Sequence, residues 1–281
     1  MSNAYLIYCR AGFEKEATAE LQHFATLNHW QGYVKSKADS AYVLFCGEDL
    51  PTTGQQAPQW RDLVFARQLL FLKHHEPLKL NAEDRISPLL AACDGMFYQD
   101  VVFEGADTND GKSLAGFFKS FAPAFNAVLK KRTLLRKKAE QRLHLFFLDS
   151  TTVYVGYSQI NNSSPWPMGV PRLRFPKDAP SRSTLKLEEA FHYYLDAESQ
   201  ANWLREGMTG VDLGAAPGGW TWQLVDRGLQ VTAIDNGPMD KALMQSGQVE
   251  HLRVDGFKYR PERPVTWLVC DMIESPARVA Q

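Results

Sequence analysis

The sequence lacks the features that mark several special classes of protein. Its four cysteines, Cys9, Cys46, Cys93 and Cys270, are scattered and form no C-x-x-C pair. This excludes a zinc knuckle and a disulfide framework, and it favours a reducing compartment and no bound metal. No apolar run approaches the roughly 18 residues of a membrane helix, and the first residues do not have the pattern of a secretory signal. We therefore expect a cytoplasmic protein.

An excess of charge of one sign is lacking too. Lys and Arg total 31, Asp and Glu total 32, and the net charge is -1, so a nucleic-acid partner would have to bind a local basic patch. Hydrophobic residues make up 44% and charged residues 22%, as in ordinary globular proteins. At about 150 residues per domain, a chain of 281 residues predicts two domains, or two and a small one.

The first 75 residues have the hydrophobic pattern of a β-α-β-β-α-β unit. Short apolar or β-branched runs predict strands, and apolar residues at helical spacing, such as Ala17, Leu21 and Phe24, predict helices. Strands are predicted at residues 4 to 9, 32 to 37, 41 to 46 and 68 to 73, and helices at residues 13 to 26 and 59 to 67. Residues 69 to 72 would equally continue the second helix.

The next part of the chain carries its densest run of charge. Helices are predicted at residues 81 to 94 and 114 to 128, strands at 98 to 104, 143 to 148 and 152 to 157, and a polar turn at 107 to 111. Residues 130 to 142 hold seven cations and one acid, Glu140. This run is either a solvated surface or a set of phosphate contacts. The candidate RNA contacts are Lys130, Lys131, Arg132, Arg136, Lys137 and Lys138, followed by Arg172 and Arg174.

A proline-rich segment divides the chain. Residues 158 to 183 carry five of the 15 prolines and almost no helical periodicity, which predicts an extended linker or a functional loop. A helical pattern begins at residue 184. From residue 210 onward, strand and helix signals alternate, as is typical of a parallel sheet.

The most informative motif is rich in glycine. Residues 210 to 221, Gly-Val-Asp-Leu-Gly-Ala-Ala-Pro-Gly-Gly-Trp-Thr, indicate a buried strand, a turn and a helix start. Such a turn lets the backbone approach a ligand closely, and free N–H groups at the helix start favour a negative group. The absence of G-x-G-x-x-G disfavours a nicotinamide enzyme, and the Asp212 carboxylate would repel a pyrophosphate. S-adenosylmethionine, with two cationic groups and one carboxylate, fits better.

Acids follow two later strands. Asp235 ends the apolar strand at residues 229 to 234, where an acid can accept both ribose hydroxyls of a nucleoside cofactor. Asp255 follows residues 251 to 254 and would lie beside the adenine. An Asp at a strand end is common in any α/β protein, so for Asp255 alone the structural interpretation is as good as the functional one. The acids and the glycine turn together favour a nucleoside cofactor.

The strand predicted at residues 265 to 270 ends at Asp271. It is followed neither by the Pro-Pro-aromatic motif of methyltransferases that act on base nitrogens nor by the Pro-Cys motif of those that attack pyrimidine carbon. A lone Asp suits a hydroxyl acceptor, because it can orient a lysine near the proton that must leave. Lys186, on the helix before the glycine turn, is the candidate, although a lysine on a helix is more often simply solvated.

These motifs together identify a family resemblance. The chain resembles the ribose 2'-O-methyltransferases with a Lys-Asp-Lys-Glu tetrad, in particular those that methylate a cytidine in bacterial 23S ribosomal RNA. The resemblance rests on YLIYCRAGFEKE, FEGADTND, SRSTLKLEEAF, VDLGAAPGGWTWQL, AIDNGPM, VDGFKYRP and WLVCDM. It implies S-adenosylmethionine as cofactor and Lys186 and Asp271 as catalytic residues. The turn and the resemblance together give as cofactor contacts Ser183, Asp212, Gly214, Ala216, Pro217, Gly218, Gly219, Asp235, Asp255 and Asp271.

The resemblance also implies a fold that combines α/β and α+β parts. The expected parts are a ferredoxin-like domain at residues 1 to 75, a THUMP RNA-binding domain at 76 to 160, the proline-rich linker at 161 to 183 and a Rossmann-like class I methyltransferase domain at 184 to 281. The family's second lysine and its glutamate lie on later strands, whereas this sequence ends ten residues after Asp271. We therefore expect a C-terminally truncated member whose last domain is incomplete after its fourth strand.

The implied partner is 23S ribosomal RNA or a large-subunit precursor, bound by a monomer with no membrane contact. The leading function is ribose 2'-O-methylation. The alternative is a non-catalytic module that binds RNA and the cofactor, because the second tetrad lysine and the glutamate are not in the sequence.

Overall fold

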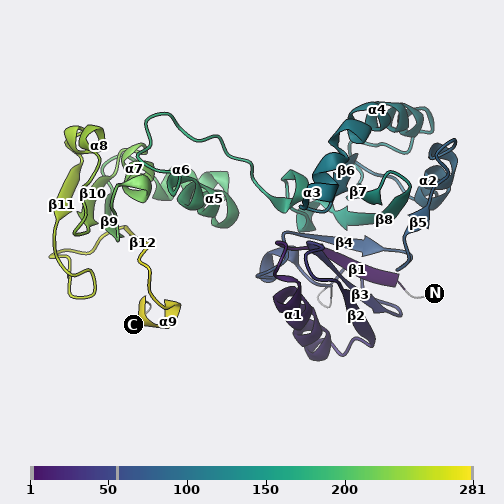
Figure 1. Ribbon diagram of the computed structural model, residues 1–281, viewed down its shortest axis with the longest axis horizontal. Helices are drawn as coiled ribbons and strands as arrows, with labels where there is room; N and C mark the ends of the chain where they lie inside the picture. The colour runs from purple at the N-terminus through teal and green to yellow at the C-terminus, as the bar shows by residue number, and fades with distance from the viewer. Residues whose placement is uncertain (1–2, 55–56, 280–281) are drawn as a thin grey trace. The chain divides into compact units, whose positions relative to one another are not determined.

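The chain divides into two compact units, Met1–Pro171 and Arg172–Gln281 (Figure 1). The computed structural model describes residues 3–54 and 57–279 of these units. None of the helices in the described ranges is long and apolar enough to cross a membrane. Each unit has its own sheet and its own apolar clusters.

The first unit is built on one eight-stranded sheet with the order β2-β3-β1-β4-β8-β7-β6, and β5 also pairs with β8. All pairs are antiparallel except β6 with β7, which is parallel. The predicted ferredoxin-like half and the half after it therefore share one sheet, joined where β4 pairs with β8. The strands are β1 (Asn3–Tyr8), β2 (Gly32–Ser36), β3 (Tyr42–Gly47), β4 (Gln68–Leu72), β5 (Leu78–Lys79), β6 (Asp100–Gly105), β7 (Gln141–Asp149) and β8 (Thr152–Gln159).

Helices cover this sheet because alternate strand residues point to opposite faces. On β7, Leu143, Leu145 and Phe147 belong to the apolar cluster that packs on α2 and α4, whereas Phe146 belongs to a second cluster with residues of β1, β3 and β4. The helices are α1 (Glu14–Leu27), α2 (Ile86–Cys93), α3 (Asn109–Ser113) and α4 (Ala115–Lys131).

The helix predicted at residues 59 to 67 is wrong. Only a 3-10 helix at Trp60–Asp62 forms there, and Gln68–Leu72 is the strand β4. Side chains from distant parts of the chain take the backbone N–H groups that a helix would use. Asn162 accepts from the N–H of Trp60 at 2.8 Å, and the Glu20 carboxylate accepts from those of Val64 and Phe65.

The start of the predicted linker packs on the first unit. It contains 3-10 helices at Ile160–Asn162 and Pro167–Gly169, and Ser164 is buried. The Ser164 carbonyl accepts from the guanidinium of Arg142 at 3.2 Å, and the Ser164 N–H donates to the Gln68 side chain at 3.1 Å. The chain therefore leaves the first unit near Pro171 rather than at residue 160. The division into four parts stays a prediction.

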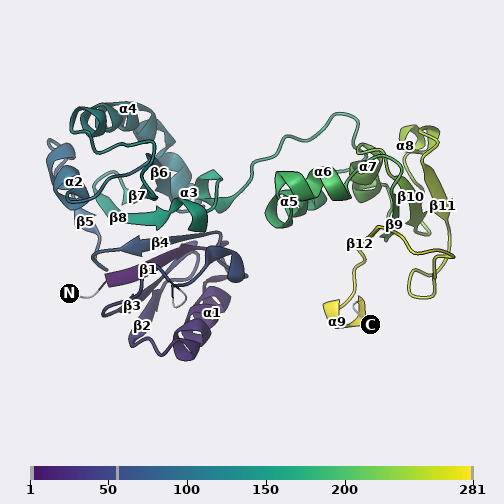
Figure 2. The ribbon, with the colours of Figure 1, turned by 180° about the vertical axis from the view of Figure 1, so that it is seen from behind.

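The second unit is built on a parallel four-stranded sheet with the order β11-β10-β9-β12 (Figure 2). One apolar cluster contains Leu187 and Phe191 of α5 and Leu224 of α7 with sheet residues, and another contains Leu243 of α8. The strands are β9 (Thr209–Leu213), β10 (Gln230–Ile234), β11 (Val249–Leu252) and β12 (Trp267–Cys270). The helices are α5 (Thr184–Tyr194), α6 (Ala197–Trp203), α7 (Gly219–Val225), α8 (Lys241–Gln245) and α9 (Pro276–Val279).

The register of this sheet fixes where the candidate site lies. Leu213 at the end of β9 pairs with Ile234 at the end of β10 and with Cys270 at the end of β12. The residues that follow these strands, Asp235 and Asp271, therefore lie at the same edge of the sheet. Ligands of open α/β sheets bind at this carboxyl edge.

Candidate cofactor and catalytic site

An open cleft of about 680 Å³ lies at the carboxyl edge of the second unit's sheet, large enough for a cofactor of nucleoside size. Three of the predicted acids, Asp235, Asp255 and Asp271, line it together with Gly214 and Ala216. The structure thus brings residues from four separate loops to one place. Met272, Ile273 and Phe257 complete much of the wall and were not among the predicted residues.

The glycine turn is shaped so that side chains are excluded. Gly214 has φ +78° and Gly218 has φ +116°, a region that L side chains rarely adopt. A side chain at Gly218 would overlap Leu243, and one at Gly219 would overlap the hydroxyl groups of Ser181 and Ser183. The turn therefore leaves a cradle in which the backbone and two hydroxyl groups are close together.

Asp235 is held by the turn while keeping free acceptor capacity. Its Oδ2 accepts from the Ala216 N–H at 3.0 Å and its Oδ1 accepts from the Gly237 N–H at 2.7 Å. Each carboxylate oxygen has a second lone pair. The side chain is therefore oriented by the backbone and can still accept from two hydroxyl groups in the cleft.

Asp255 is less constrained than Asp235. Its Oδ1 accepts from the Phe257 N–H at 3.0 Å, and Lys258 lies 3.9 Å from its Oδ2. Half of its side chain is exposed. Asp255 lies at the rim of the cleft, where its contact with an adenine stays a prediction.

Asp212 lies behind the turn and does not line the cleft. Its side chain is fully buried, and its Oδ2 accepts from the Thr221 hydroxyl at 2.7 Å. Its Oδ1 is buried with no hydrogen-bond partner among the described residues. Burial raises the pKa of Asp212 to about 6, the bonds from Thr221 oppose this, and the charges of Asp271 and Asp235 add to it. A cationic group in the cleft would favour the ionised form.

The two predicted catalytic residues form an ion pair. Lys186 Nζ lies 3.1 Å from each carboxylate oxygen of Asp271. Lys186 is on α5, 85 residues before Asp271 at the end of β12. The side chains are 63% and 34% exposed, so the pair is open to a substrate. The structure brings the two predicted residues together, and their catalytic role stays a prediction.

Ser183 lies just before α5 and belongs to the wall of the glycine cradle. Its hydroxyl is 2.6 Å from that of Ser181, and its carbonyl accepts from Trp220 Nε1 at 2.9 Å. These bonds tie the start of α5 to α7. Sequence reasoning missed Ser181, Thr221 and Gly237, although the Asp-Asn-Gly sequence at 235 to 237 is a turn signal that pointed to Gly237.

The predicted RNA contacts are exposed. Lys130 and Lys131 end α4, Arg132 caps it, and Arg136, Lys137 and Lys138 follow in a turn before β7. None of these six cations, nor Arg172 or Arg174 in the second unit, forms an ion pair within the described parts of the chain. The Arg136 guanidinium lies 3.1 Å from the centre of the Phe97 ring.

Arg142, the last cation of the basic run, differs from the other six. It pairs with both carboxylate oxygens of Asp100 on the neighbouring strand, at 2.7 and 2.9 Å. This contact joins paired residues of β6 and β7, so Arg142 stabilises the sheet.

Comparisons with protein families agree along the chain. A ferredoxin-like domain of the RlmM family matches residues 1–70, the N-terminal domain of ribosomal RNA large subunit methyltransferase M matches residues 84–159, and an FtsJ-like methyltransferase domain matches residues 179–278.

Curated relatives match nearly all of the chain. Ribosomal RNA large subunit methyltransferase M of Cellvibrio japonicus is 48% identical over 99% of this chain and 80% of its own length. The proteins of the same name from Methylococcus capsulatus and Stutzerimonas stutzeri are also 48% identical over 99% of this chain, and 79% and 80% of their lengths are covered. These comparisons do not bear out the expectation of a truncated chain.

Proposed function

The chain belongs to the family of ribosomal RNA large subunit methyltransferase M, and from this premise we propose that it methylates the ribose 2'-hydroxyl of a cytidine in 23S ribosomal RNA. The observation that carries the proposal is the Lys186–Asp271 ion pair at the mouth of the strand-end cleft. In the proposed reaction, the sulfonium of the methyl donor and the ribose oxygen that accepts the methyl group meet at the carboxyl edge of this sheet.

S-adenosylmethionine fits the residues that form the cleft. Asp235 has two free acceptor sites for the ribose hydroxyls, and Gly214 and Ala216 of the glycine turn line the cleft beside it. Asp212 does not line the cleft, but its buried carboxylate lies behind the turn, and its charge would attract the cationic end of the cofactor without direct contact. When bound, the cofactor supplies a methyl group on a sulfonium, ready for transfer.

The chain's own residues must align the acceptor oxygen and stabilise its charge. Methyl transfer is an in-line displacement, so the 2'-oxygen must point at the methyl group along the bond that breaks. The oxygen–methyl bond forms as the sulfur–methyl bond breaks, and the proton of the 2'-hydroxyl passes to solvent water. Lys186, held between both oxygens of Asp271, donates toward the acceptor oxygen and stabilises the negative charge that develops on it. Asp271 keeps the lysine in place and is a positioning residue for it.

The RNA contacts are part of the same proposal. The six exposed cations at residues 130 to 138 contact phosphates in the first unit, and Arg172 and Arg174 do so in the second. Phosphate contacts fix the position of RNA without selecting its sequence. The partner is 23S ribosomal RNA or a large-subunit precursor, the protein acts as a monomer, and it works in the cytoplasm, where ribosomal RNA is made.

The test is methyl transfer by the chain itself. The protein is incubated with S-adenosylmethionine labelled in its methyl group and with unmodified 23S ribosomal RNA, and the digested RNA is analysed for 2'-O-methylcytidine. We expect label in this nucleoside, and none with Asp271→Asn. Binding of both RNA and cofactor without transfer would support the non-catalytic module instead. Label in a methylated base would contradict the proposed hydroxyl acceptor.

A further inference from the structure

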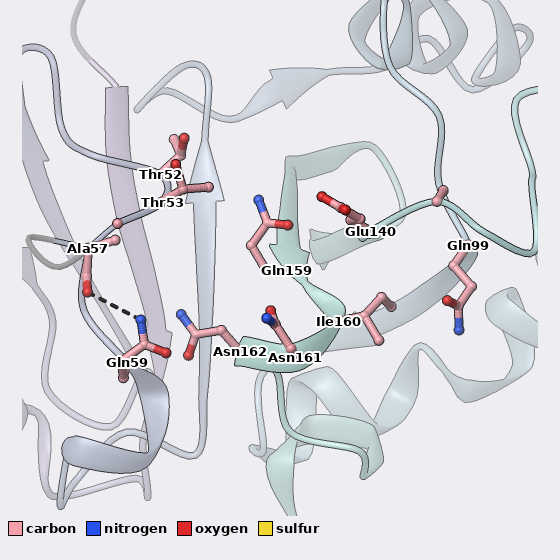
Figure 3. Close-up of a pocket in the computed structure, with 12 residues that line it drawn as sticks. Thr52, Thr53, Ala57, Gln59, Gln99, Glu140, Gln159, Ile160, Asn161 and Asn162 are labelled. Atoms are coloured by element: carbon pink, nitrogen blue, oxygen red, sulfur yellow. Dashed lines mark hydrogen bonds between the residues drawn. The ribbon is translucent and has the colours of Figure 1, made fainter.

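The first unit contains a pocket that the proposed reaction does not use. It lies between residues 52 to 54, 57 and 59 on one side and Gln99 and Glu140 on the other, with residues 159 to 162 between them (Figure 3). Its volume is about 460 Å³, within the range of pockets that hold small molecules. All of its walls belong to the unit that carries the basic run.

The lining of this pocket is polar and almost neutral. Five carboxamides line it, those of Gln59, Gln99, Gln159, Asn161 and Asn162. Among the lining residues that the structure describes there is one carboxylate, Glu140, and no lysine or arginine. A phosphate group inside the pocket would be next to the carboxylate without a cation to balance it, so the lining suits a neutral group.

Several of these amides are available to a ligand. Asn162 is engaged, since it accepts from the Trp60 N–H and donates to the Pro58 carbonyl. The side chains of Gln99, Gln159 and Asn161 make no hydrogen bond within the described residues. A carboxamide offers a donor and an acceptor side by side, which is the arrangement that the edge of a nucleobase requires.

Backbone hydrogen bonds fix the basic run to the rim of the pocket. The Arg136 N–H donates to the Tyr98 carbonyl at 2.8 Å, and the Gln99 N–H donates to the Gln141 carbonyl at 2.7 Å. The Ile160 N–H donates to the Glu140 carbonyl at 2.8 Å. The exposed Arg136, Lys137 and Lys138 therefore lie within four residues of lining residues on the same segment.

The pocket has two features, a nearly neutral lining of carboxamides and exposed cations beside it. A ligand that is neutral, has donors and acceptors along one edge and is joined to negatively charged groups would fit both. We propose that the pocket holds one unpaired nucleobase of the RNA substrate, while Arg136, Lys137 and Lys138 contact the adjoining phosphates. This inference rests on the proposed function, because it takes RNA as the substrate. The base must be unpaired, since base edges in an A-form duplex are engaged in pairing and its major groove is too narrow for side chains.

The test compares single-stranded and duplex RNA. Fluorescence anisotropy measures the affinity of the full chain for a labelled single-stranded RNA dodecamer and for the duplex of the same sequence. In Gln99→Leu/Gln159→Leu we expect affinity for the single strand to fall about tenfold, as when one bidentate amide contact to a base is lost. Affinity for the duplex should stay unchanged. Gln22→Leu, which changes an exposed side chain of α1 in the same unit, is the matched control.

Two further variants separate this effect from misfolding and from charge. Gln99→Ala removes an exposed side chain, so it leaves folding intact and should still weaken single-strand binding severalfold. Arg136→Gln/Lys137→Gln/Lys138→Gln should weaken both RNAs and reduce the slope of log affinity against log salt by up to about two units, at roughly 0.7 per charge. The glutamine-to-leucine variant should keep the parent's slope.

The outcomes distinguish the inference from the function on which it rests. If the parent binds RNA and the Gln99 and Gln159 variants bind single strands equally well, the base pocket is wrong and the methyltransferase proposal stands. If the parent binds neither RNA, the proposed function is wrong and the pocket assignment falls with it. Equal losses for single strand and duplex would also overturn the base pocket.

Discussion

Glu104 in the first unit and Asp212 in the second are both buried carboxylates on strands, and their pKa values are shifted in opposite directions. Glu104 on β6 is 5% exposed. Burial raises its pKa, but the bond and charge from His144 and the bonds from the Met168 N–H and Tyr8 outweigh burial, so the pKa is lowered. Asp212 on β9 is fully buried with one donor, Thr221, and its pKa is raised to about 6.

The contrast separates polar residues whose hydrogen bonds are all made within the protein from those that keep hydrogen-bonding capacity. Both oxygens of Glu104 are engaged, by Tyr8 at 2.7 Å, His144 at 3.3 Å and the Met168 N–H at 2.6 Å. His144 also contacts the Ser158 hydroxyl at 2.8 Å. The contacts from Ser158 through His144 to Glu104 resemble a hydrolase triad, but all three side chains are buried. A cluster that is saturated and closed to substrate stabilises the sheet it spans.

The carboxyl edge of the second unit's sheet, where the cofactor is proposed to bind, differs from this cluster because its polar groups are not saturated. Asp212 Oδ1 is unpartnered among the described residues, Asp235 keeps acceptor sites, and Asp271, which pairs with the exposed Lys186, lines an open cleft. Changes at this edge should therefore reduce activity or binding more than stability. Changes in the buried cluster of Tyr8, Glu104, His144 and Ser158 should do the reverse.

The largest effect is expected for Lys186→Ala. Loss of a group that acts in the transition state should reduce methyl transfer by about 10²- to 10⁴-fold, with the affinity for cofactor nearly unchanged, because Lys186 interacts mainly when the proton and the methyl group move. Single-turnover transfer and calorimetry with S-adenosylmethionine measure the two quantities. Lys241→Ala, an exposed lysine on α8, is the control. A variant that retained a third of the parent rate would show that Lys186 is a solvated lysine without a role in methyl transfer.

The next effect is on stability, in the first unit. His144→Ala leaves the buried Glu104 with one partner fewer, and an unsatisfied buried polar group costs about 1 to 3 kcal/mol, more when it is charged. Urea unfolding should show this loss in the first unit, while cofactor affinity is retained. Exposed Glu83→Gln in the same unit is the control. Because the pKa of Glu104 is lowered, its contribution is present above the unfolded pKa and is lost as the pH falls through the lower folded pKa. Unchanged stability would make the cluster incidental.

The sequence predicted which residues lie at the carboxyl edge of the second unit's sheet, because the signals for them are local. Strand β9, the glycine turn and α7 are consecutive, and the acids that follow β10 and β12 are placed by the regular register of a parallel sheet. The pattern of the apolar runs therefore determined which side chains reach the edge. The Lys186–Asp271 contact, across 85 residues, came from the family resemblance and not from periodicity.

The features that the sequence did not predict depend on residues far apart in the chain. The helix expected at residues 59 to 67 is absent because Glu20 and Asn162 take its N–H groups. Arg142 was counted with the basic run, but the parallel register of β6 and β7 places it opposite Asp100. The Glu104 cluster joins β1, β6, β7 and β8, and no local pattern marks such a set.

A smaller effect is expected for Asp235→Ala, on cofactor binding. Charge-assisted hydrogen bonds to two ribose hydroxyls are worth roughly 1.5 to 3 kcal/mol, so the dissociation constant for S-adenosylmethionine should rise about 10- to 150-fold. Calorimetry measures it. The exposed Glu250→Ala on β11 is a matched loss of a carboxylate. An unchanged dissociation constant would mean that the ribose lies elsewhere in the cleft.

The smallest effect tests the raised pKa of Asp212 directly. A folded pKa of about 6 lies above the unfolded value near 3.9, so the folded state holds a proton that the unfolded state releases. The contribution of this group is present below the unfolded pKa and is lost as the pH rises to about 6. Asp212→Asn cannot ionise, so its stability relative to the parent should rise by about 2 kcal/mol between roughly pH 4.5 and 7. Chemical unfolding of the second unit at both pH values measures this difference, with the exposed Asp178→Asn as control. A difference that did not change with pH would show that Asp212 has partners as sufficient as those of Glu104, and the contrast between the two buried carboxylates would be lost.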